Sequence, residues 1–286
     1  MKFNQLLNKF LIEEIHQDLQ AILDRDDGNI HSDFIKTLHT IRDSGIENKM
    51  KKGSSRLVFF PKDHRSMIVD GNQVKIPSVI KIAYKSEFDK HLNSDTTLGQ
   101  EQNKAESHYL NRKRFSILSN DKGELKTNEN GIFAPVLKTS KNHSWLEMAR
   151  TEPVDESKFQ ELTKTETHPN GITHKQMYDV VNNEYKKKTQ NKNLPNPTGM
   201  NSEQYQHILK HPLIKKLLNV CIETKSHPSD FRIANFGEFT HPVTGHKQLA
   251  LIDYGYNDKV SDLYVDSRLN AEKNLYEEIE PFKPKS

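Results

Sequence analysis

The sequence predicts an α+β protein in which an antiparallel sheet with one accompanying helix precedes a mainly helical half. Three observations support this. Apolar residues recur at three- and four-residue steps before residue 45, form short β-prone runs between residues 53 and 84, and return to helical spacing after residue 150. We therefore divide the 286 residues into an N-terminal helical extension (1–48), a strand-rich part (49–150) and a mainly helical part (151–286).

Composition excludes several classes of protein. The 42 basic and 39 acidic residues are interspersed and leave a net charge of +3, so charge indicates no specific nucleic-acid binding. Cys221 is the only cysteine, which excludes an intrachain disulfide and suits a reducing compartment. No apolar run approaches the roughly 20 residues that span a bilayer, and charges interrupt the N-terminus. We expect a cytoplasmic protein with neither a membrane span nor a signal peptide.

Two amphipathic helices are predicted in the N-terminal extension. The first carries an apolar stripe from Phe3 to Leu23, and the second begins after Ser32 as N-cap and ends near Gly45. These helices either pack on their own domain or form an arm that docks a protein partner or a second copy. The first interpretation is the commoner fate of an apolar helix face.

The strand-rich part is predicted to be a meander, a helix and two further strands. Apolar runs separated by turn-forming residues predict the meander at residues 57–60, 67–69 and 79–82. A polar helix is expected from about Gly99 to Leu118, followed by a loop rich in Asn, Asp and Lys. The last two strands are expected at residues 132–137 and 144–148.

The second half is predicted to be helical up to a closing hairpin. Residues 155–200 are sparsely apolar, and residues 186–197 have the composition of an exposed loop. Pro212 fits the first turn of a helix whose apolar stripe includes Cys221, which assigns this thiol to packing. Strands at residues 237–240 and 248–252 are expected to pair through a turn.

The most informative polar residues lie on either side of that hairpin. Asp230 is followed five residues later by Asn235, and Asp253 ends an apolar strand before Tyr254 and Gly255. Phosphoryl transfer from Mg-ATP needs an acidic group near the attacking oxygen and oxygen ligands for the metal. In such a site Asp230 would accept the acceptor's proton, while Asn235 and Asp253 would ligate Mg²⁺.

This order of residues resembles the protein-kinase-like superfamily. The family has a catalytic Asp with Asn five residues later and then an Asp-Phe-Gly triplet, for which this chain has Asp253-Tyr254-Gly255. Arg232 stands where the family commonly has a basic residue, which implies contact with the transferred phosphate. The resemblance implies a two-lobed fold with a strand-rich N-lobe and a reduced, mainly helical C-lobe, binding ATP and Mg²⁺.

The resemblance extends into the strand-rich part. The strand Val79-Ile80-Lys81-Ile82-Ala83 is similar to the family's lysine-bearing strand, which implies that Lys81 contacts the ATP phosphates. Lys85 is the alternative. Glu106 is the implied partner of this lysine, and Glu101 is the second choice. An ordinary solvated helix glutamate is the competing interpretation of either acid.

Further nucleotide contacts are implied at two places. Gly53-Ser54-Ser55 stands at the position of the family's glycine-rich phosphate loop, with one glycine instead of three. The strand Leu146-Glu147-Met148-Ala149 stands at the hinge, where adenine would contact the backbone of residues 147–149 and the side chain of residue 146. A plain core strand is the alternative there. Together these segments look like the small kinase-like proteins encoded in bacteriophage genomes.

Two departures from the family pattern bear on activity. Pro228-Ser229 replaces the His-Arg that precedes the catalytic Asp, so control through a phosphorylated activation loop is not expected. Only 31 residues follow Gly255, and they contain no Ala-Pro-Glu motif, which reduces the platform for an acceptor. Three hypotheses follow: a phosphotransferase acting on an unidentified protein or small acceptor, an inactive pseudokinase with a structural or interaction role in the host cytoplasm or a phage particle, or transfer of AMP.

Other chemistries have less support. His207 and His211 are four residues apart, a spacing that can bind zinc, but no third ligand is evident. We expect them on a surface helix. His241 and His246 flank a turn and are expected to be exposed.

Overall fold

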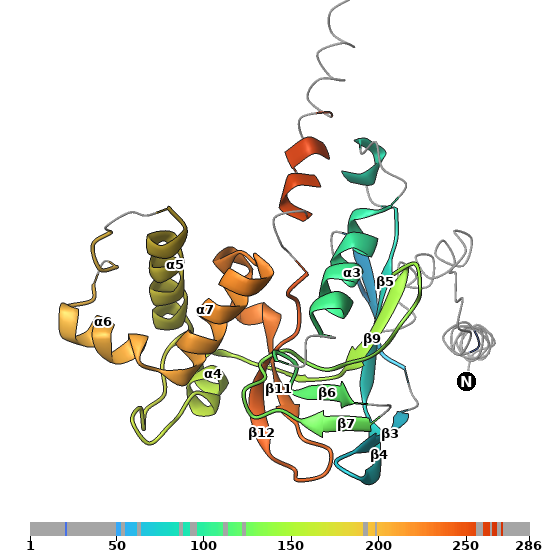
Figure 1. Cartoon of the computed structure of the whole chain (residues 1–286), viewed down its shortest axis with the longest axis horizontal. Coiled ribbons are helices and arrows are strands. Elements are labelled where there is room, and N and C mark those ends of the chain that lie inside the picture. Colours follow the sequence, from blue (N-terminus) through green and yellow to red (C-terminus); the bar gives the residue numbers. More distant parts are fainter. Residues whose placement is uncertain are drawn as a thin grey trace, which may run out of the picture.

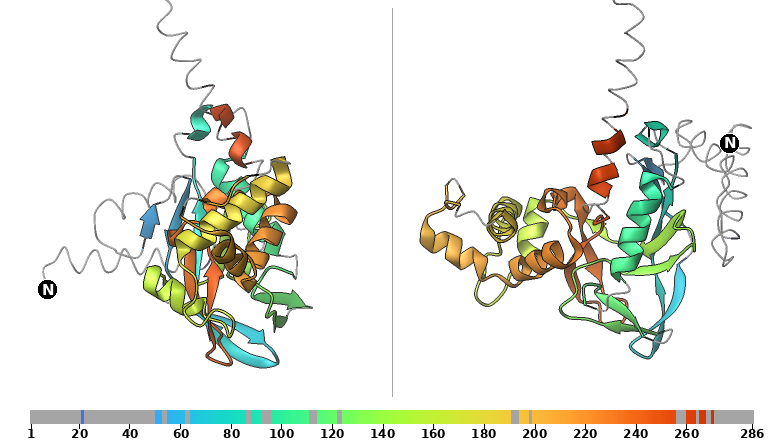
Figure 2. Two further views of the ribbon diagram at one scale, coloured as in Figure 1. Left: turned by 90° about the vertical axis from the view of Figure 1, so that its left-hand side faces the viewer. Right: turned by 45° about the horizontal axis from the view of Figure 1, so that its top comes forward.

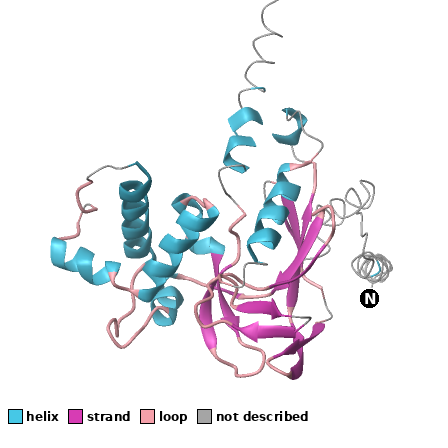
Figure 3. Cartoon of the chain, in the orientation of Figure 1, coloured by secondary structure: helices cyan, strands magenta, loops and turns pink. Residues whose placement is uncertain are grey.

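The computed structural model describes residues 21, 50–52, 55–61, 64–85, 88–91, 96–110, 114–121, 124–190, 194–197, 199–255, 260–263, 265–267 and 270. Apart from residue 21, the two predicted N-terminal helices lie outside these residues. The described part mixes helices with antiparallel sheets, which confirms the predicted α+β class. Most strands gather on one side of the molecule and most helices on the other (Figure 3). Within the described residues, no helix has the length and apolar character needed to cross a membrane.

Strands dominate the described residues up to residue 153, and helices dominate from there to the closing hairpin. The strands are β1 (Met50–Lys52), β2 (Arg56–Phe59), β3 (Arg65–Val69), β4 (Asn72–Ile76), β5 (Ser78–Ala83), β6 (Leu118–Asp121), β7 (Glu124–Thr127), β8 (Val136–Thr139), β9 (Trp145–Ala149), β10 (Glu152–Pro153), β11 (Phe236–Thr240) and β12 (Lys247–Leu251). The helices are α3 (Leu98–Leu110), α4 (Glu156–Leu162), α5 (His174–Gln190), α6 (Ser202–Leu209) and α7 (Pro212–Thr224), with short 3₁₀ turns η1 (Phe88–His91), η2 (Pro228–Asp230) and η3 (Ile233–Asn235).

The largest sheet places β5 at its centre. Its order is β1-β2-β5-β9-β8, and β5 pairs antiparallel with both β2 and β9. Helix α3 lies against this sheet, while α4 to α7 group on the opposite side of the molecule (Figures 1 and 2). Every residue of β5 is buried. Because side chains alternate along a strand, Lys81 faces away from Ile80 and Ile82 and towards α3.

Two smaller sheets contain the main departures from the predicted strands. One has the order β4-β3-β7-β6, and the other has the order β10-β11-β12. β4 was not predicted, because its sequence is polar; it follows a tight turn in which Asp70 (φ 47°) and Gly71 (φ 80°) are left-handed. β6 and β7 occupy the segment predicted to be a loop, and α3 ends at Leu110, before the predicted Leu118. Backbone pairing forms these strands without an apolar pattern.

The helical part confirms some predictions and corrects others. α7 begins at Pro212 with a buried stripe that includes Cys221, and β11 pairs with β12, both as expected. The segment after residue 155 contains α4 and α5, in agreement with the predicted helical half. α5 extends to Gln190 and includes residues that were assigned to an exposed loop. Lys and Gln are good helix formers, and buried Met177, Val180 and Val181 anchor the helix.

One continuous core joins the strand-rich and helical parts. Phe133 stacks on Tyr254 with ring centroids 3.9 Å apart. The backbone N–H of Ala134 donates to the carbonyl of Leu251 at 3.0 Å, and the N–H of Leu251 donates to Ile132 at 2.7 Å. These contacts fix the end of β12, and with it Asp253, relative to the central sheet.

His211 is not on a surface helix, as the sequence suggested, but is the buried N-cap of α7. Its Nδ1 accepts from the N–H of Leu213 at 3.1 Å, and its Nε2 donates to the carbonyl of Thr163 at 2.7 Å. Burial lowers the pKa of His211. His241 is likewise buried rather than exposed, and its Nε2 lies 2.7 Å from Thr127 Oγ1.

We expect His211→Ala to lower the free energy of unfolding by about 1–3 kcal/mol at pH 7.5, because it removes a cap and leaves a buried carbonyl unpaired. A depressed folded-state pKa means that the neutral form stabilises the fold above about 6.5 and that this stability is lost as pH falls further. The variant should therefore lose less stability than the wild type between pH 7.5 and 5. Urea titrations at both pH values, with exposed His246→Ala as control, measure this. An unchanged pH dependence would refute it.

Candidate functional site

Lys81 and Glu106 form a buried ion pair between β5 and α3. Lys81 Nζ lies 3.1 Å from Oε1 and 2.9 Å from Oε2 of Glu106, whose side chain is fully buried. Nζ also donates to the carbonyl of Ile252 at 2.6 Å. An ammonium group has three hydrogens, so these three acceptors satisfy it completely. The sheet, α3 and the segment after β12 therefore meet at one cation.

The alternative residues from the sequence do not meet in this way. Lys85 is exposed beyond the end of β5. Glu101 is buried near the start of α3, where Thr96 Oγ1 donates to it at 3.2 Å. The structure thus brings Lys81 and Glu106 together, which are the first choices of the sequence argument.

Arg56 is a site residue that the sequence argument did not assign. It begins β2, and its side chain is only 6% exposed. Its NH1 lies 2.9 Å from Glu106 Oε1, and its NH2 lies 2.6 Å from Asp253 Oδ1. The neighbouring carboxylates raise the pKa of Arg56 although burial opposes the charge. The sequence offered one sign of this role, a charged residue directly before the apolar residues of β2. No sequence motif, however, links position 56 to position 253.

Asp230 and Asn235 lie together on the two short turns that lead into β11. Asn235 Nδ2 donates to the backbone carbonyl of Asp230 at 2.6 Å and to its Oδ1 at 3.3 Å. The N–H of Ile252 donates to the carbonyl of Asn235 at 2.8 Å, which connects this pair to the segment bearing Asp253. Asp230 Oδ2 is buried and has no hydrogen-bond partner among the described residues.

The two carboxylates differ in electrostatic environment. Burial and the nearby charge of Asp253 raise the pKa of Asp230 to about 7. Burial opposes ionisation of Asp253 as well, but the charges of Arg56 and Lys81 outweigh it and lower the pKa of Asp253. At neutral pH Asp253 is therefore a carboxylate, while Asp230 is poised to gain or lose a proton.

Gly255 is required by close packing rather than by a positive φ. A Cβ at this position would lie 2.8 Å from the backbone oxygen of Gln102 in α3. The side chain of the same Gln102 accepts a short hydrogen bond from Ser55 Oγ.

Gly53 and Ser54, the other predicted phosphate-loop residues, lie outside the described residues. Arg232 is exposed. Its positive charge lowers the pKa of Asp230 and so opposes the effect of burial.

Tyr254 carries a buried hydroxyl without a hydrogen-bond partner among the described residues. We expect Tyr254→Phe to keep the stacking on Phe133 and to raise the free energy of unfolding by about 1 kcal/mol, because an unpaired buried polar group is costly. Urea denaturation measures the change, and Phe133→Leu, which removes the stacking instead, should destabilise. A loss of stability in Tyr254→Phe would mean that the hydroxyl has a partner in solution.

The predicted hinge strand is a fully buried strand of the central sheet. The Glu147 carboxylate accepts from Ser78 Oγ at 2.7 Å and pairs with Arg65 at 2.5 Å. The N–H of Ala149 donates to the carbonyl of Pro135 at 2.7 Å, so it is already used within the sheet. Contact of adenine with residues 147–149, including Met148, stays a prediction, but the Ala149 N–H is not a free donor for it.

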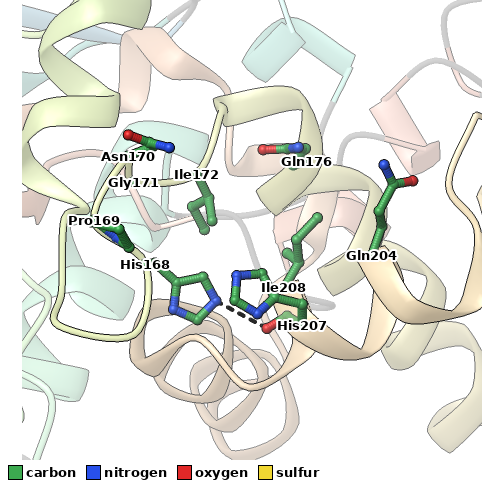
Figure 4. A pocket seen from close by; sticks show the side chains of 9 residues that line it. All are labelled: His168, Pro169, Asn170, Gly171, Ile172, Gln176, Gln204, His207 and Ile208. Carbon is green, nitrogen blue, oxygen red and sulfur yellow. Dashed lines mark hydrogen bonds between the residues drawn. The ribbon is translucent and has the colours of Figure 1, made fainter.

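A separate hollow lies in the helical part (Figure 4). It has a volume of about 200 Å³ and is lined by His168, Pro169, Asn170, Gly171, Ile172, Gln176, Gln204, His207 and Ile208. The His207 and His168 rings are tilted by 31° with centroids 4.1 Å apart, and His168 Nε2 donates to the His207 carbonyl at 3.0 Å. His207 and His211 belong to different helices. This hollow is not lined by Lys81, Glu106, Asp230 or Asp253.

The donor set near Asp253 suits a hard divalent cation. Asn235 uses its amide nitrogen towards Asp230, which leaves its Oδ1 as an acceptor, and the Asp253 side chain is 43% exposed. Mg²⁺ binds few protein oxygens and completes its shell with water and phosphate. The orphaned oxygen of Asp230 adds acceptor capacity. Over the described ranges, no group of three or more His, Cys, Asp or Glu residues is placed to hold a metal ion.

Comparisons with family models, with curated proteins and with solved structures found no match to this chain.

Proposed function

We propose that this chain is a kinase-like protein that binds ATP with Mg²⁺ and transfers the γ-phosphoryl group to a protein or small acceptor. One observation carries the proposal. The Lys81 ammonium lies within hydrogen-bonding distance of both the Glu106 carboxylate and the Ile252 carbonyl, although these residues are separated by up to 171 positions in sequence order. The proposal includes a two-lobed arrangement, with the sheet and α3 as the N-lobe and α4 to α7 with β11 and β12 as the C-lobe.

The proposed role of each residue follows from its charge and its position in the site. Lys81, held by Glu106, would contact the phosphates, and Asn235 with Asp253 would hold Mg²⁺, which would neutralise the phosphate charge when bound. Gly53, Ser54 and Ser55 would cover the phosphates, and the β9 strand would line the adenine site. Arg232, exposed beside Asp230, would contact the transferred group.

Asp230 would act as the general base. The acceptor hydroxyl oxygen bonds to the γ-phosphorus, the bond from that phosphorus to the bridging oxygen breaks, ADP leaves, and the acceptor's proton passes to Asp230. A base works best when its pKa lies near the working pH, and the pKa of Asp230 at about 7 meets this condition. Its Oδ2 has no hydrogen-bond partner among the described residues.

The test is label transfer from ATP. Label from γ-labelled ATP should appear in a protein or small acceptor with wild-type enzyme and should be lost with Asp230→Ala. Label from α-labelled ATP instead would identify AMP transfer by the same site. No transfer of either label across a broad acceptor screen would refute catalysis.

A second candidate is a pseudokinase with a structural or interaction role, in the cytoplasm or in a phage particle. The 2.6 Å pair between Arg56 and Asp253 favours it, because it occupies a carboxylate that catalysis needs for metal. The predicted N-terminal helices would provide the protein partner's contact. Deleting residues 1–45 should then abolish assembly and leave nucleotide binding intact, whereas an unaffected complex would exclude this role.

A further inference from the structure

Arg56 bridges two carboxylates that come from different elements. Its guanidinium contacts Glu106 in α3 and Asp253 after β12, and NH1 also donates to Asn103 Oδ1 at 3.3 Å. The backbone of Arg56 is held by pairing with Ala83 of β5. The side chain is therefore fixed at both ends, with its charged group inside the site rather than in solvent.

Lys81 and Asp253 already have partners within the site. Lys81 donates all three ammonium hydrogens, two to the Glu106 carboxylate and one to the Ile252 carbonyl. Asp253, the carboxylate proposed to hold metal, already has a cation at 2.6 Å. A cation within hydrogen-bonding distance of a carboxylate competes with any second cation for the same charge.

We propose that Arg56 is a positioning residue that neutralises Asp253 in the nucleotide-free protein and must release it when metal and nucleotide bind. The inference rests on the proposed function, because it concerns the metal-holding role of Asp253. It predicts how the nucleotide-free protein binds metal. Metal alone should bind poorly, since it has to displace Arg56, and nucleotide should help by offering phosphate oxygens to the released guanidinium, which suits bidentate anions.

The opposite assignment makes an opposite prediction. If Arg56 served only to hold β2, α3 and the β12 end together, removing it would loosen Asp253 and weaken metal binding. If it competes with metal, removing its charge would free Asp253 and strengthen metal binding. The sign of the change therefore separates the two roles, and a loss of thermal stability alone does not.

The experiment is a titration of the nucleotide-free full chain with Mn²⁺, a spectroscopic substitute for Mg²⁺, following the paramagnetic resonance signal of the free ion. Arg56→Gln should bind Mn²⁺ about tenfold more tightly than the wild type, which is the factor expected when one charge-assisted hydrogen bond no longer competes. Arg65→Gln is the matched control. Its guanidinium also pairs with a buried glutamate, Glu147, but contacts neither Asp253 nor Glu106, so its Mn²⁺ affinity should equal that of the wild type.

Arg56→Lys keeps the charge without the planar fork and provides a milder variant. It should bind Mn²⁺ more tightly than the wild type but less tightly than Arg56→Gln, and it decides the matter if the glutamine variant does not fold. Equal or weaker Mn²⁺ binding by the folded Arg56 variants, with ATP and Mg²⁺ still bound by the wild type, would overturn the role of Arg56 alone. Failure of the wild type to bind ATP with Mg²⁺ would overturn this inference together with the proposed function.

Discussion

Asp230→Asn should abolish phosphoryl transfer while making the nucleotide-free protein more stable in alkaline solution. The amide cannot accept the acceptor's proton, and loss of a general base lowers a rate by about 10²–10⁴-fold. The substitution is nearly isosteric, and Asn235 can still donate to the Oδ1 atom at position 230. Binding of ATP with Mg²⁺ should therefore survive. Label transfer and ATP titration, run in parallel, measure the two effects.

The stability gain has a defined sign and pH window. The pKa of Asp230 is about 7 in the folded protein and near 3.8 when unfolded, so its contribution is fully present below pH 3.8 and is lost as pH rises through about 7. At about 1.4 kcal/mol per pKa unit, Asp230→Asn should be more stable than the wild type by a few kcal/mol at pH 8. The gain in stability should be smaller at pH 5. Asp262→Asn, an exposed carboxylate, is the control. A variant less stable than the wild type at pH 8 would contradict this environment for Asp230.

Lys81→Met should remove ATP binding and destabilise the fold. Glu106 is fully buried, and without Lys81 its charge is balanced by Arg56 alone. Breaking a buried ion pair by removing one partner costs about 3–5 kcal/mol, and the remaining contact to Arg56 should keep the loss near the lower value. Transfer from ATP should fall by at least about 100-fold. Urea titration and ATP-dependent shifts in melting temperature measure both effects.

Controls separate the loss of stability from the loss of function. Lys85→Met changes an exposed lysine next to the same strand and should leave stability and ATP binding unchanged. The double variant Lys81→Met with Glu106→Gln removes the unbalanced carboxylate and should recover most of the stability without recovering ATP binding. Retained ATP binding in Lys81→Met, or its loss in Lys85→Met, would move the phosphate contact away from Lys81.

The sequence argument located the central pair because the resemblance to kinase-like proteins could be laid on a predicted strand and a predicted helix. The resemblance to kinase-like proteins implied a lysine on this strand and a glutamate on the next helix, and the structure joins Lys81 and Glu106 at 2.9 Å. The short spacing from Asp230 to Asn235 placed two further polar groups, which hydrogen-bond to each other and which the Ile252 N–H connects to the segment bearing Asp253.

Other features depend on contacts that no local pattern records. Arg56 reaches Asp253 across 197 positions, so its role is visible only once β2, α3 and β12 are packed. β4, β6 and β7 are polar strands held by backbone pairing, and the buried state of His211 and His241 comes from neighbours distant in sequence. In each of these cases tertiary packing decides the outcome, while composition indicated a loop or an exposed surface.

Isothermal titration of the wild-type chain with ATP tests the central claim most directly. In Mg²⁺ the account predicts one ATP bound per chain, with the affinity falling sharply when EDTA replaces the metal, because Asn235 and Asp253 hold nucleotide through the cation. Absence of binding at millimolar ATP in Mg²⁺ would contradict a nucleotide site at Lys81, Glu106 and Asp253.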